Sequence, residues 1–325
     1  MSGLSELRLG FIPLTDCAPL AVAATLGFFE DEGLAVELVR EASWATIRDK
    51  VAVGALDGAH MLAPMALAAG GAILAPLALN RNGAAITVST ALAGTIGPKG
   101  EGLAEVVAAR RASGRGTLTF AVVFPESMHN YLLRDWLAAA GIDPDRDVRL
   151  VVIPPPRMVE RMRAGEVDGF CVGAPWNAVA EAEGLGRILI TASQLLPGGP
   201  DKVLGVPATL AEQRPDDLRA CLRAVIRGAA WADDPINRED LIAILARPDV
   251  VGAAPAAIAR ALANEIVFHR DGASLPRRED GLWMASRMVR WGQLRAGVDL
   301  DALVDRVYRS DLYRDAAEIS GHLLA

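Results

Sequence analysis

Two side chains in the sequence stand where an α/β protein could use them to hold a small anion. Trp44 lies near the start of a predicted helix that follows a strand, and His129 opens a second such helix. The N-terminal ends of these helices lie at the carboxyl edge of a sheet, where backbone N–H groups and the helix dipole favour negative charge. An imidazole placed there could donate a hydrogen bond to an anion, and an indole there could line a ligand site. A core tryptophan and a capping or surface histidine are the structural alternatives.

Four further polar residues have simpler interpretations. Thr15 and Asp16 stand at the first turn from strand to helix, where they could supply a hydroxyl or a helix cap, and capping alone explains Asp16. His60 lies inside a short apolar strand and is interpreted as a structural histidine. Lys202 precedes an apolar run, and a solvated loop lysine is the default interpretation there.

These residues belong to two similar sets of predicted strands and helices. Each set alternates strand, helix, strand, helix, strand, which predicts a parallel α/β sheet. The elements of the first set are 6–13, 16–33, 34–41, 43–56 and 57–62, and those of the second are 118–125, 127–142, 147–154, 155–167 and 168–175. The segment "GALDGAHMLAPM" of the first set aligns with "GEVDGFCVGAPW" of the second, so the second set echoes the first.

The segment "LNRNGAAITVS", residues 79–89, stands between the two sets. We expect it to cross from one lobe to another, with Asn82 and Gly83 forming a turn beside the hinge. A β-hairpin at Asn-Gly is the alternative. A return crossing is expected near "KVLGVPATL", and helices follow. The predicted lobes are 1–85 (lobe one, first part), 86–204 (lobe two) and 205–325 (return to lobe one and C-terminal helices), with a ligand cleft between the lobes.

Composition limits the functions that the chain could have. It has 325 residues, of which 52% are hydrophobic and 22% charged, as expected for a globular α/β protein of two lobes. Its net charge of −7 provides no basic surface for nucleic acid or an anionic membrane, so we expect no direct contact with either. The three cysteines, Cys17, Cys171 and Cys221, form neither a disulfide framework nor a zinc pattern. Buried small residues are the expected role of Cys17 and Cys171.

The N-terminal sequence bears on location. "MSGLSELRLGFIPLTD" contains no basic segment followed by an apolar stretch, as a secretion signal would. No window supplies the roughly twenty uninterrupted apolar residues of a membrane-spanning helix. We therefore expect a cytoplasmic protein.

From residue 8 to about 235, the sequence resembles the nitrate-binding proteins of the NrtA/CmpA/NasS group, which belong to the periplasmic-binding-protein-like superfamily. The resemblance is carried by "LGFIPLTDCAPLAVA", "EASWATIRDKVAVGALDGAHMLAPM", "SMHNYLLRDWLAAAGIDPDRDVRLVVIPPP", "DGFCVGAPWNAVAEAEG" and "DKVLGV". It implies an α/β, two-lobed type II periplasmic-binding-protein-like fold with two hinge strands and a helical C-terminal region packed on lobe one. The sequence looks most like NasS-type members, which sense nitrate or nitrite in the cytoplasm and sequester NasT, an RNA-binding antiterminator, until the anion binds.

The resemblance also implies which residues bind the anion. The family has a Trp at the position of Trp44, a His at that of His129 and a Lys at that of Lys202, where the Lys provides the positive charge. Bicarbonate-binding members are similar but carry an acidic residue in place of the Lys. Lys202 therefore favours nitrate or nitrite and argues against a calcium-assisted site. No cofactor and no metal are expected.

The sequence departs from the NasS-like pattern at three positions. Where that pattern has "PPPQM" and "GEPW", this chain has "PPPRM" and "GAPW", so Arg157 adds a positive charge and Ala174 removes a negative one. Ala84 replaces an amide that relatives often carry at the hinge. Arg157 could restore a donor, since its fork suits planar oxyanions, or could be a solvated residue at a helix start. Trp176 could close the cleft or pack in a core. The predicted ligand-binding residues are Trp44, His129, Lys202, Arg157, Ala84, Thr15 and Trp176.

The predicted function is a cytoplasmic nitrate or nitrite sensor whose lobes close on the anion and which controls an antiterminator partner. One alternative is the substrate-binding component of an ABC-type transporter for nitrate or a related oxyanion; the sequence contains no G-x-x-x-x-G-K-[ST] ATPase motif. Another is an enzyme similar to the pyrimidine synthases of thiamine biosynthesis, which use a similar fold. The cysteine-rich motif of those enzymes is missing here, as are G-x-S-x-G and G-x-G-x-x-G motifs, so we expect no enzymatic activity.

Overall fold

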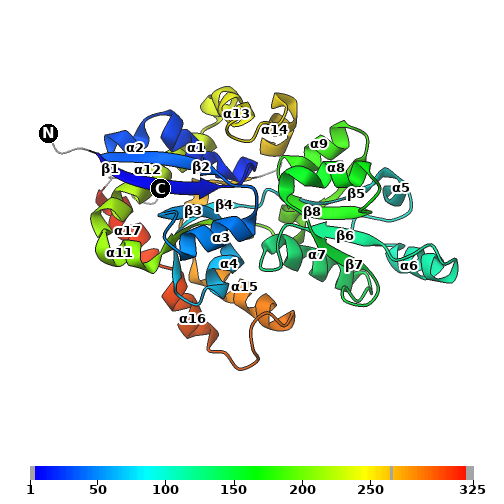
Figure 1. The fold of residues 1–325 in the computed structure, drawn as a ribbon. Coiled ribbons are helices and arrows are strands. Elements are labelled where there is room, and N and C mark those ends of the chain that lie inside the picture. The colour runs from blue at the N-terminus through cyan, green and yellow to red at the C-terminus, as the bar shows by residue number, and fades with distance from the viewer. Residues whose placement is uncertain (1–3, 264–265, 320–325) are drawn as a thin grey trace.

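The computed structural model describes residues 4–263 and 266–319 of the chain. Two five-stranded sheets form the centres of two lobes, which lie side by side in Figure 1. The strands are β1 (Ser5–Phe11), β2 (Leu34–Arg40), β3 (Gly58–Leu62), β4 (Ile73–Arg81), β5 (Ala84–Ser89), β6 (Thr119–Val122), β7 (Arg149–Val152), β8 (Gly169–Gly173), β9 (Gly186–Thr191) and β10 (Pro200–Pro207). Their order is β2-β1-β3-β10-β4 in the first sheet and β7-β6-β8-β5-β9 in the second.

Helices connect these strands and cover the sheets. The first lobe contains α1 (Ala18–Thr25), α2 (Phe28–Asp31), α3 (Trp44–Ala52) and α4 (Ala63–Ala68). The second contains α5 (Thr90–Ala93), α6 (Leu103–Ala112), α7 (Met128–Ala139), α8 (Met158–Arg163), α9 (Trp176–Ala182) and α10 (Ala192–Leu195). The C-terminal region contains α11 (Ala208–Gln213), α12 (Pro215–Asp233), α13 (Arg238–Ala246), α14 (Pro255–Leu262), α15 (Arg278–Arg290), α16 (Leu300–Val307) and α17 (Ser310–Ile319).

The two sheets are built alike, as the echo in the sequence predicts. In the first, β1 pairs in parallel with β2 and β3; in the second, β6 pairs in parallel with β7 and β8. The fourth strand is antiparallel in both cases: β10 runs against β3, and β5 runs against β8. Each antiparallel strand comes from the part of the chain that links the lobes. The architecture is therefore the two-lobed α/β periplasmic-binding-protein fold expected from the sequence.

The chain crosses between the sheets at Asn82 and Gly83. β4 ends one residue earlier in the first sheet, and β5 begins one residue later in the second. Both crossing residues have positive φ, 60° for Asn82 and 87° for Gly83, a conformation that Asn and Gly tolerate best. The hairpin alternative is therefore wrong, because β4 and β5 do not pair with one another. The return crossing precedes β10, so Lys202 lies in the first sheet rather than at the end of lobe two.

The starts of the first helices differ in how they are capped. Ser43 caps α3, because its side chain accepts a hydrogen bond from the Thr46 N–H at 3.2 Å. The single helix predicted over 16–33 is wrong: a 3-10 turn (Thr15–Cys17), α1 and α2 occupy it, and Gly27 between the two helices has a φ of 74°. The capping role of Asp16 is also wrong, because α1 begins after Cys17 and has no side-chain cap.

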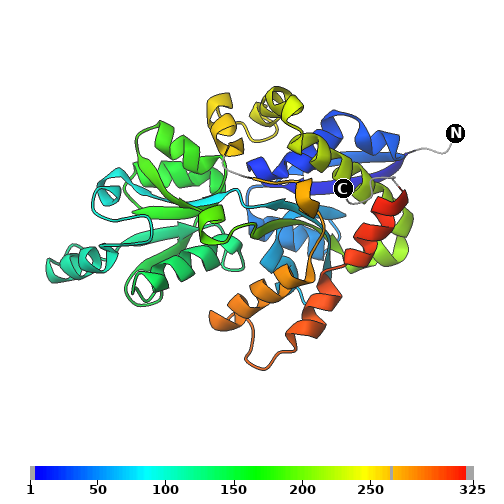
Figure 2. The ribbon, with the colours of Figure 1, turned by 180° about the vertical axis from the view of Figure 1, so that it is seen from behind.

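The C-terminal helices pack on lobe one from two sides. α12 lies against α1 and α17, whereas α15 and α16 lie against α4 (Figures 1 and 2). Two of these helices also reach the second lobe: α14 contacts α9, and α15 forms ion pairs with α7. The C-terminal region thus holds the lobes together in this arrangement. None of the helices in residues 4–263 and 266–319 is both long enough and apolar enough to cross a membrane.

Candidate functional site

The side chains that could hold a ligand gather where the two sheets face one another. Trp44 is the first residue of α3, and the Ser43 cap fixes the direction in which this helix begins. The indole ring is fully buried and meets the ring of His60 edge-on, with centroids 5.2 Å apart. Lys202 Nζ lies 5.8 Å from the centroid of the Trp44 ring, within cation–π range. The indole Nε1 has no hydrogen-bond partner among the residues that the structure describes.

Lys202 is fully buried between two carboxylates. Its Nζ donates to Asp16 Oδ2 at 2.9 Å and to Asp201 Oδ2 at 2.6 Å. Neighbouring residues of a regular strand point to opposite faces, but the pairing of β10 with β4 shifts register on both sides of Lys202. This irregularity brings the consecutive side chains of Asp201 and Lys202 together. The solvated loop lysine is therefore not what the structure shows.

His60 supports this group from β3. Its Nδ1 accepts the Ile12 N–H at 3.4 Å, so Nε2 carries the proton of the neutral ring. Nε2 lies 2.8 Å from Asp16 Oδ1. The ring thereby fixes the carboxylate of Asp16 on the side opposite to Lys202. The structural role predicted for His60 is consistent with these contacts, although they place it inside the candidate site.

His129 approaches from the second lobe. It is the second residue of α7, whose cap Ser127 accepts the Asn130 N–H at 3.1 Å. The imidazole is fully buried, and Nε2 lies 3.9 Å from Asp201 Oδ2, beyond hydrogen-bond distance. Neither ring nitrogen has a hydrogen-bond partner within the described part of the chain. A buried imidazole without partners is unusual, and a ligand would account for it.

Thr15 and Gly173 show how closely the lobes meet here. The Thr15 N–H donates to the Ala174 carbonyl at 2.8 Å, which joins the first 3-10 turn to the end of β8. Thr15 Oγ1 is buried and, among the described residues, has no partner. A Cβ added to Gly173 would lie 3.1 Å from Asp16 Oδ2 and 3.6 Å from His129 Nε2. Glycine at position 173 therefore lets the two lobes approach one another closely, because a Cβ there would crowd Asp16.

Burial and mutual attraction set the charges of the histidines and the lysine. Burial lowers the pKa of His129 well below its usual range, and the Lys202 ammonium acts in the same direction, so the ring is neutral near pH 7. Burial likewise lowers the pKa of His60, against the attraction of Asp16. Burial opposes the charge of Lys202, but the two carboxylates outweigh it and raise the pKa of the ammonium. Lys202 therefore remains protonated.

The two carboxyl groups differ. Burial acts to raise the pKa of both, and Lys202 acts to lower it. For Asp16, the ammonium and the His60 ring prevail, and its pKa lies below the usual range. For Asp201, burial and the charge of Asp16 prevail, and its pKa rises to about 6. Asp16 is thus a permanent anion at neutral pH, whereas Asp201 can gain a proton after a modest change in its surroundings.

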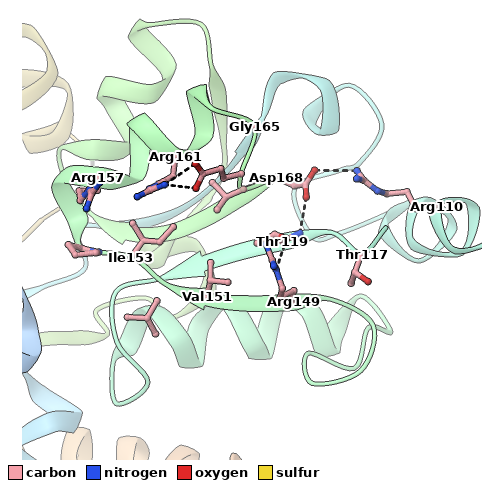
Figure 3. A pocket seen from close by; sticks show the side chains of 14 residues that line it. Arg110, Thr117, Thr119, Arg149, Val151, Ile153, Arg157, Arg161, Gly165 and Asp168 are labelled. Carbon is pink, nitrogen blue, oxygen red and sulfur yellow. Dashed lines mark hydrogen bonds and ion pairs between the residues drawn. The ribbon is translucent and has the colours of Figure 1, made fainter. Parts of the chain in front are cut away.

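The remaining predicted residues differ in how close they lie to this cluster. Trp176 begins α9, and its Nε1 donates to the Pro13 carbonyl at 3.1 Å, so it links the lobes rather than facing a ligand. Ala84 is buried at the start of β5 and lines a cavity of about 10 Å³ next to Asp201. Arg157 is 54% exposed, near Glu160, and lines an open groove of about 610 Å³ on lobe two with Arg149 (Figure 3). The structure does not bring Arg157 to Lys202.

Asp201 was missed by the sequence analysis, and Asp16 was assigned only a capping role. A signal for both exists: a lysine inside an apolar strand must be neutralised by acids, and Asp201 is its neighbour.

The three cysteines are buried and free. Burial raises the pKa of the Cys17 and Cys171 thiols, which makes them poor nucleophiles. The arrangement can bind a small anion with neutral and charged donors.

Comparison with known proteins agrees with this description. Residues 2–246 match the model of the NMT1-like family. The chain belongs to that family. It is 37% identical to the nitrate/nitrite binding protein NrtA of Synechococcus elongatus, over 97% of this chain and 78% of that protein. It is also 37% identical to the bicarbonate transport ATP-binding protein CmpC of Synechocystis sp., over 98% of this chain. The chain spans half the length of CmpC and of some other relatives.

A solved structure supports the same fold. The crystal structure of the periplasmic nitrate-binding protein NrtA from Synechocystis PCC 6803 superposes with a TM-score of 0.91 and 31% identity, covering 97% of this chain and 89% of that one. NrtA is named as a binding protein in both comparisons. The resemblance noted in the sequence is confirmed at the level of an NrtA-like periplasmic-binding-protein fold.

Proposed function

We propose that this chain binds nitrate or nitrite between its two lobes. The observation that carries the proposal is a set of buried groups around Lys202 that have no hydrogen-bond partner among the described residues. Besides the Asp201 Oδ1 acceptor, they are Trp44 Nε1, Thr15 Oγ1 and the His129 ring nitrogens. Nitrate is planar, with three weakly accepting oxygens and no proton to donate. It therefore suits a site whose free groups are an indole N–H, a hydroxyl and a neutral imidazole beside an ammonium.

Closure of the lobes supports the same conclusion. Lys202, His60 and His129 are fully buried, so an anion among them would exchange its water shell for fixed donors. Micromolar affinity corresponds to roughly −8 kcal/mol, which two or three charge-assisted hydrogen bonds and lobe closure could provide. The similarity to the nitrate/nitrite binding protein NrtA favours these anions over others.

The finer role in our proposal is a cytoplasmic sensor. It rests on the resemblance of the quoted stretches to NasS-type proteins, in which the anion-free form holds a NasT-like antiterminator. The anion would favour the closed form, and the partner would bind the open one. Linkage then requires that the anion weaken partner binding by the ratio of its affinities for the two forms.

A transport role is the second candidate. The observation that favours it is the similarity to a periplasmic nitrate-binding protein with a TM-score of 0.91. Co-purification distinguishes the two roles: a sensor would release a NasT-like protein when nitrate is added. A protein that fails to bind any NasT-like partner, with or without nitrate, would favour transport.

The binding proposal is tested by calorimetric titration with nitrate, nitrite, bicarbonate and sulfate. Trp44→Phe keeps an aromatic ring against His60 but removes the Nε1 donor, so nitrate affinity should fall about five- to tenfold, as expected for one lost hydrogen bond. Trp231→Phe, in α12 on lobe one, is the matched control and should bind as the wild type does. Arg157→Gln should leave the order of anion preference unchanged, because Arg157 lies on the outer groove. Absence of nitrate and nitrite binding in the wild type would refute the proposal.

A further inference from the structure

The candidate site contains more negative charge than positive charge before any ligand enters. One ammonium, Lys202, stands between two carboxylates at 2.9 and 2.6 Å, and all three side chains are at most 4% exposed. Within the described residues, the other ion-pair partners of Asp16 and Asp201 are the rings of His60 and His129. Both rings are neutral near pH 7. With both carboxylates ionised, the buried group carries one net negative charge.

An entering anion makes this imbalance worse. A monoanion beside Lys202 would bring the net charge of the buried group to two negatives. An uncompensated buried charge costs several kcal/mol in proteins, and such groups usually change their protonation state instead. The lobes close over the group, so water cannot compensate the charge. One proton must therefore accompany the anion if the closed form is to be stable.

The contacts of the two carboxylates show which of them can accept that proton at lower cost. Asp16 is held on both sides, by Lys202 at Oδ2 and by His60 at Oδ1. Asp201 has Lys202 on Oδ2, while the His129 ring on α7 stands 3.9 Å away. The remaining titratable group that faces it is the neutral thiol of Cys171 on β8. The Asn80 side chain also stabilises the ionised form of Asp201. Protonation of Asp201 nevertheless weakens one close ion pair, whereas protonation of Asp16 would weaken two. A protonated carboxyl can also donate a hydrogen bond to the anion.

We propose that the site takes up a monoanion together with one proton, and that Asp201 receives the proton. The inference rests on the proposed anion-binding function and describes how the same site meets the charge of its ligand. It makes Asp201 a residue that determines specificity: with Asp201 neutral, Lys202 and Asp16 cancel, and the site accepts one negative charge. Binding of a dianion such as sulfate would require the site to take up a second proton. Asp16 does not accept one, because Lys202 and His60 keep it ionised. The pKa of Asp201, raised to about 6 without any ligand, agrees with this assignment.

Calorimetry on the wild type measures the proton directly. Nitrate is titrated in Hepes and in Tris at about pH 7.5, and the difference in observed heat, divided by the difference in buffer ionisation enthalpy, gives the protons bound per anion. Nitrate is the base of a strong acid, so any proton taken up resides on the protein. We expect close to one proton, and nitrate affinity that falls about tenfold per pH unit from about pH 6 to 8. An uptake near zero would overturn the proposal.

Variants assign the proton to a residue. Asp201→Asn removes the titrating group, so proton uptake should disappear and nitrate affinity should be independent of pH over the same range. Asp315→Asn, whose carboxylate forms an exposed pair with Arg219 on lobe one, should keep the wild-type uptake and slope. If uptake persists in Asp201→Asn, another group such as His129 receives the proton and the assignment is wrong.

Failure of the inference is distinct from failure of the proposed function. A wild type that binds nitrate without proton uptake contradicts the inference and leaves the function intact. A wild type that binds neither nitrate nor nitrite at any pH contradicts the function itself. If Asp201→Asn does not fold, the two-buffer titration of the wild type still decides whether a proton is taken up.

Discussion

At the scale of single residues, the central feature is a buried lysine shared by two acids. Removing charges from water is costly, so such groups are stable only with well-placed partners. Lys202 has Asp16 and Asp201 within hydrogen-bond distance, and the Trp44 ring lies nearby. His60 Nε2 lies 2.8 Å from Asp16, whereas His129 Nε2 lies 3.9 Å from Asp201. The two acids therefore respond differently to pH and to substitution.

This difference predicts how Asp201 affects stability. Its pKa is raised from 3.8 to about 6, so the stabilisation by its proton is complete below the unfolded pKa and is lost as the pH rises through about 6. This rise of the pKa limits the contribution of the proton to the free energy of unfolding to about 3 kcal/mol. Asp201→Asn cannot ionise and should be more stable than the wild type at pH 8, by an amount that shrinks toward pH 5. Urea unfolding at several pH values measures it; a constant difference would contradict the raised pKa.

The same residues show what the sequence could predict. Trp44 and His129 stand at helix starts after strands, a pattern that indicates the carboxyl edge of a sheet, and the structure brings both to the cluster. The position of Asp201 next to Lys202 in the sequence suggests a counter-ion, but the alternation of a regular strand directs its side chain away from Lys202. The register shift in β10 reverses this, and no pattern in the sequence indicates such a shift. Arg157 was expected at the cleft but is the last residue of a 3-10 turn (Pro155–Arg157) on the outside of lobe two.

At the scale of elements, capped helix starts hold the donors in place. Trp44 and His129 each lie within two residues of a serine cap, Ser43 and Ser127. Ser127 is fully buried, and besides accepting from Asn130 it donates to the Phe124 carbonyl at 2.6 Å. These two bonds fix the turn between β6 and α7, and hence the direction of the His129 ring. Stability and binding are therefore coupled at this cap.

Ser127→Ala tests this coupling. Loss of the cap should lower the free energy of unfolding by about 1 kcal/mol and should also weaken nitrate binding several-fold, because the first turn of α7 would no longer hold His129 in one direction. Chemical unfolding and calorimetric titration of the same preparation give both values.

A matched control separates the two effects. Asp299 caps α16, far from the cluster, by accepting the Ala302 N–H at 3.0 Å. Asp299→Ala should lose comparable stability and retain wild-type affinity. Equal losses of affinity in the two variants would mean that lower stability, rather than the position of His129, explains the effect.

At the scale of the whole molecule, ion pairs far from Lys202 connect the two lobes. Asp135 on α7 forms ion pairs with Arg287 at 2.7 Å and Arg290 at 3.0 Å, both on α15. Arg260 on α14 pairs with Glu181 on α9. The two C-terminal helices that carry these arginines lie on opposite sides of the sheets in Figure 1, α15 below and α14 above. The C-terminal helices thus contribute to the balance between open and closed forms.

Asp135→Ala should shift that balance toward the open form. Partly exposed ion pairs each contribute up to about 1 kcal/mol, so apparent nitrate affinity should fall by a factor of roughly two to ten. Small-angle scattering without ligand should show a larger radius of gyration than that of the wild type. Saturating nitrate should return the radius to the wild-type value. Asp315→Ala breaks an ion pair within lobe one and should change neither quantity. An unchanged affinity in Asp135→Ala would mean that these pairs do not favour closure.

The complete burial of the cluster also has a consequence for timing. Trp44 is 1% exposed, and His129 and Lys202 are 0% exposed, so a trapped anion has no route out while the lobes stay together. Its escape can be no faster than the rate at which the chain swings apart at Asn82 and Gly83 and before β10. Two anions of unequal affinity would then have the same upper limit on their dissociation rates. When the mixture of anions in solution changes, the protein would keep the anion that it bound at its last closure. It would exchange that anion only when the lobes next open.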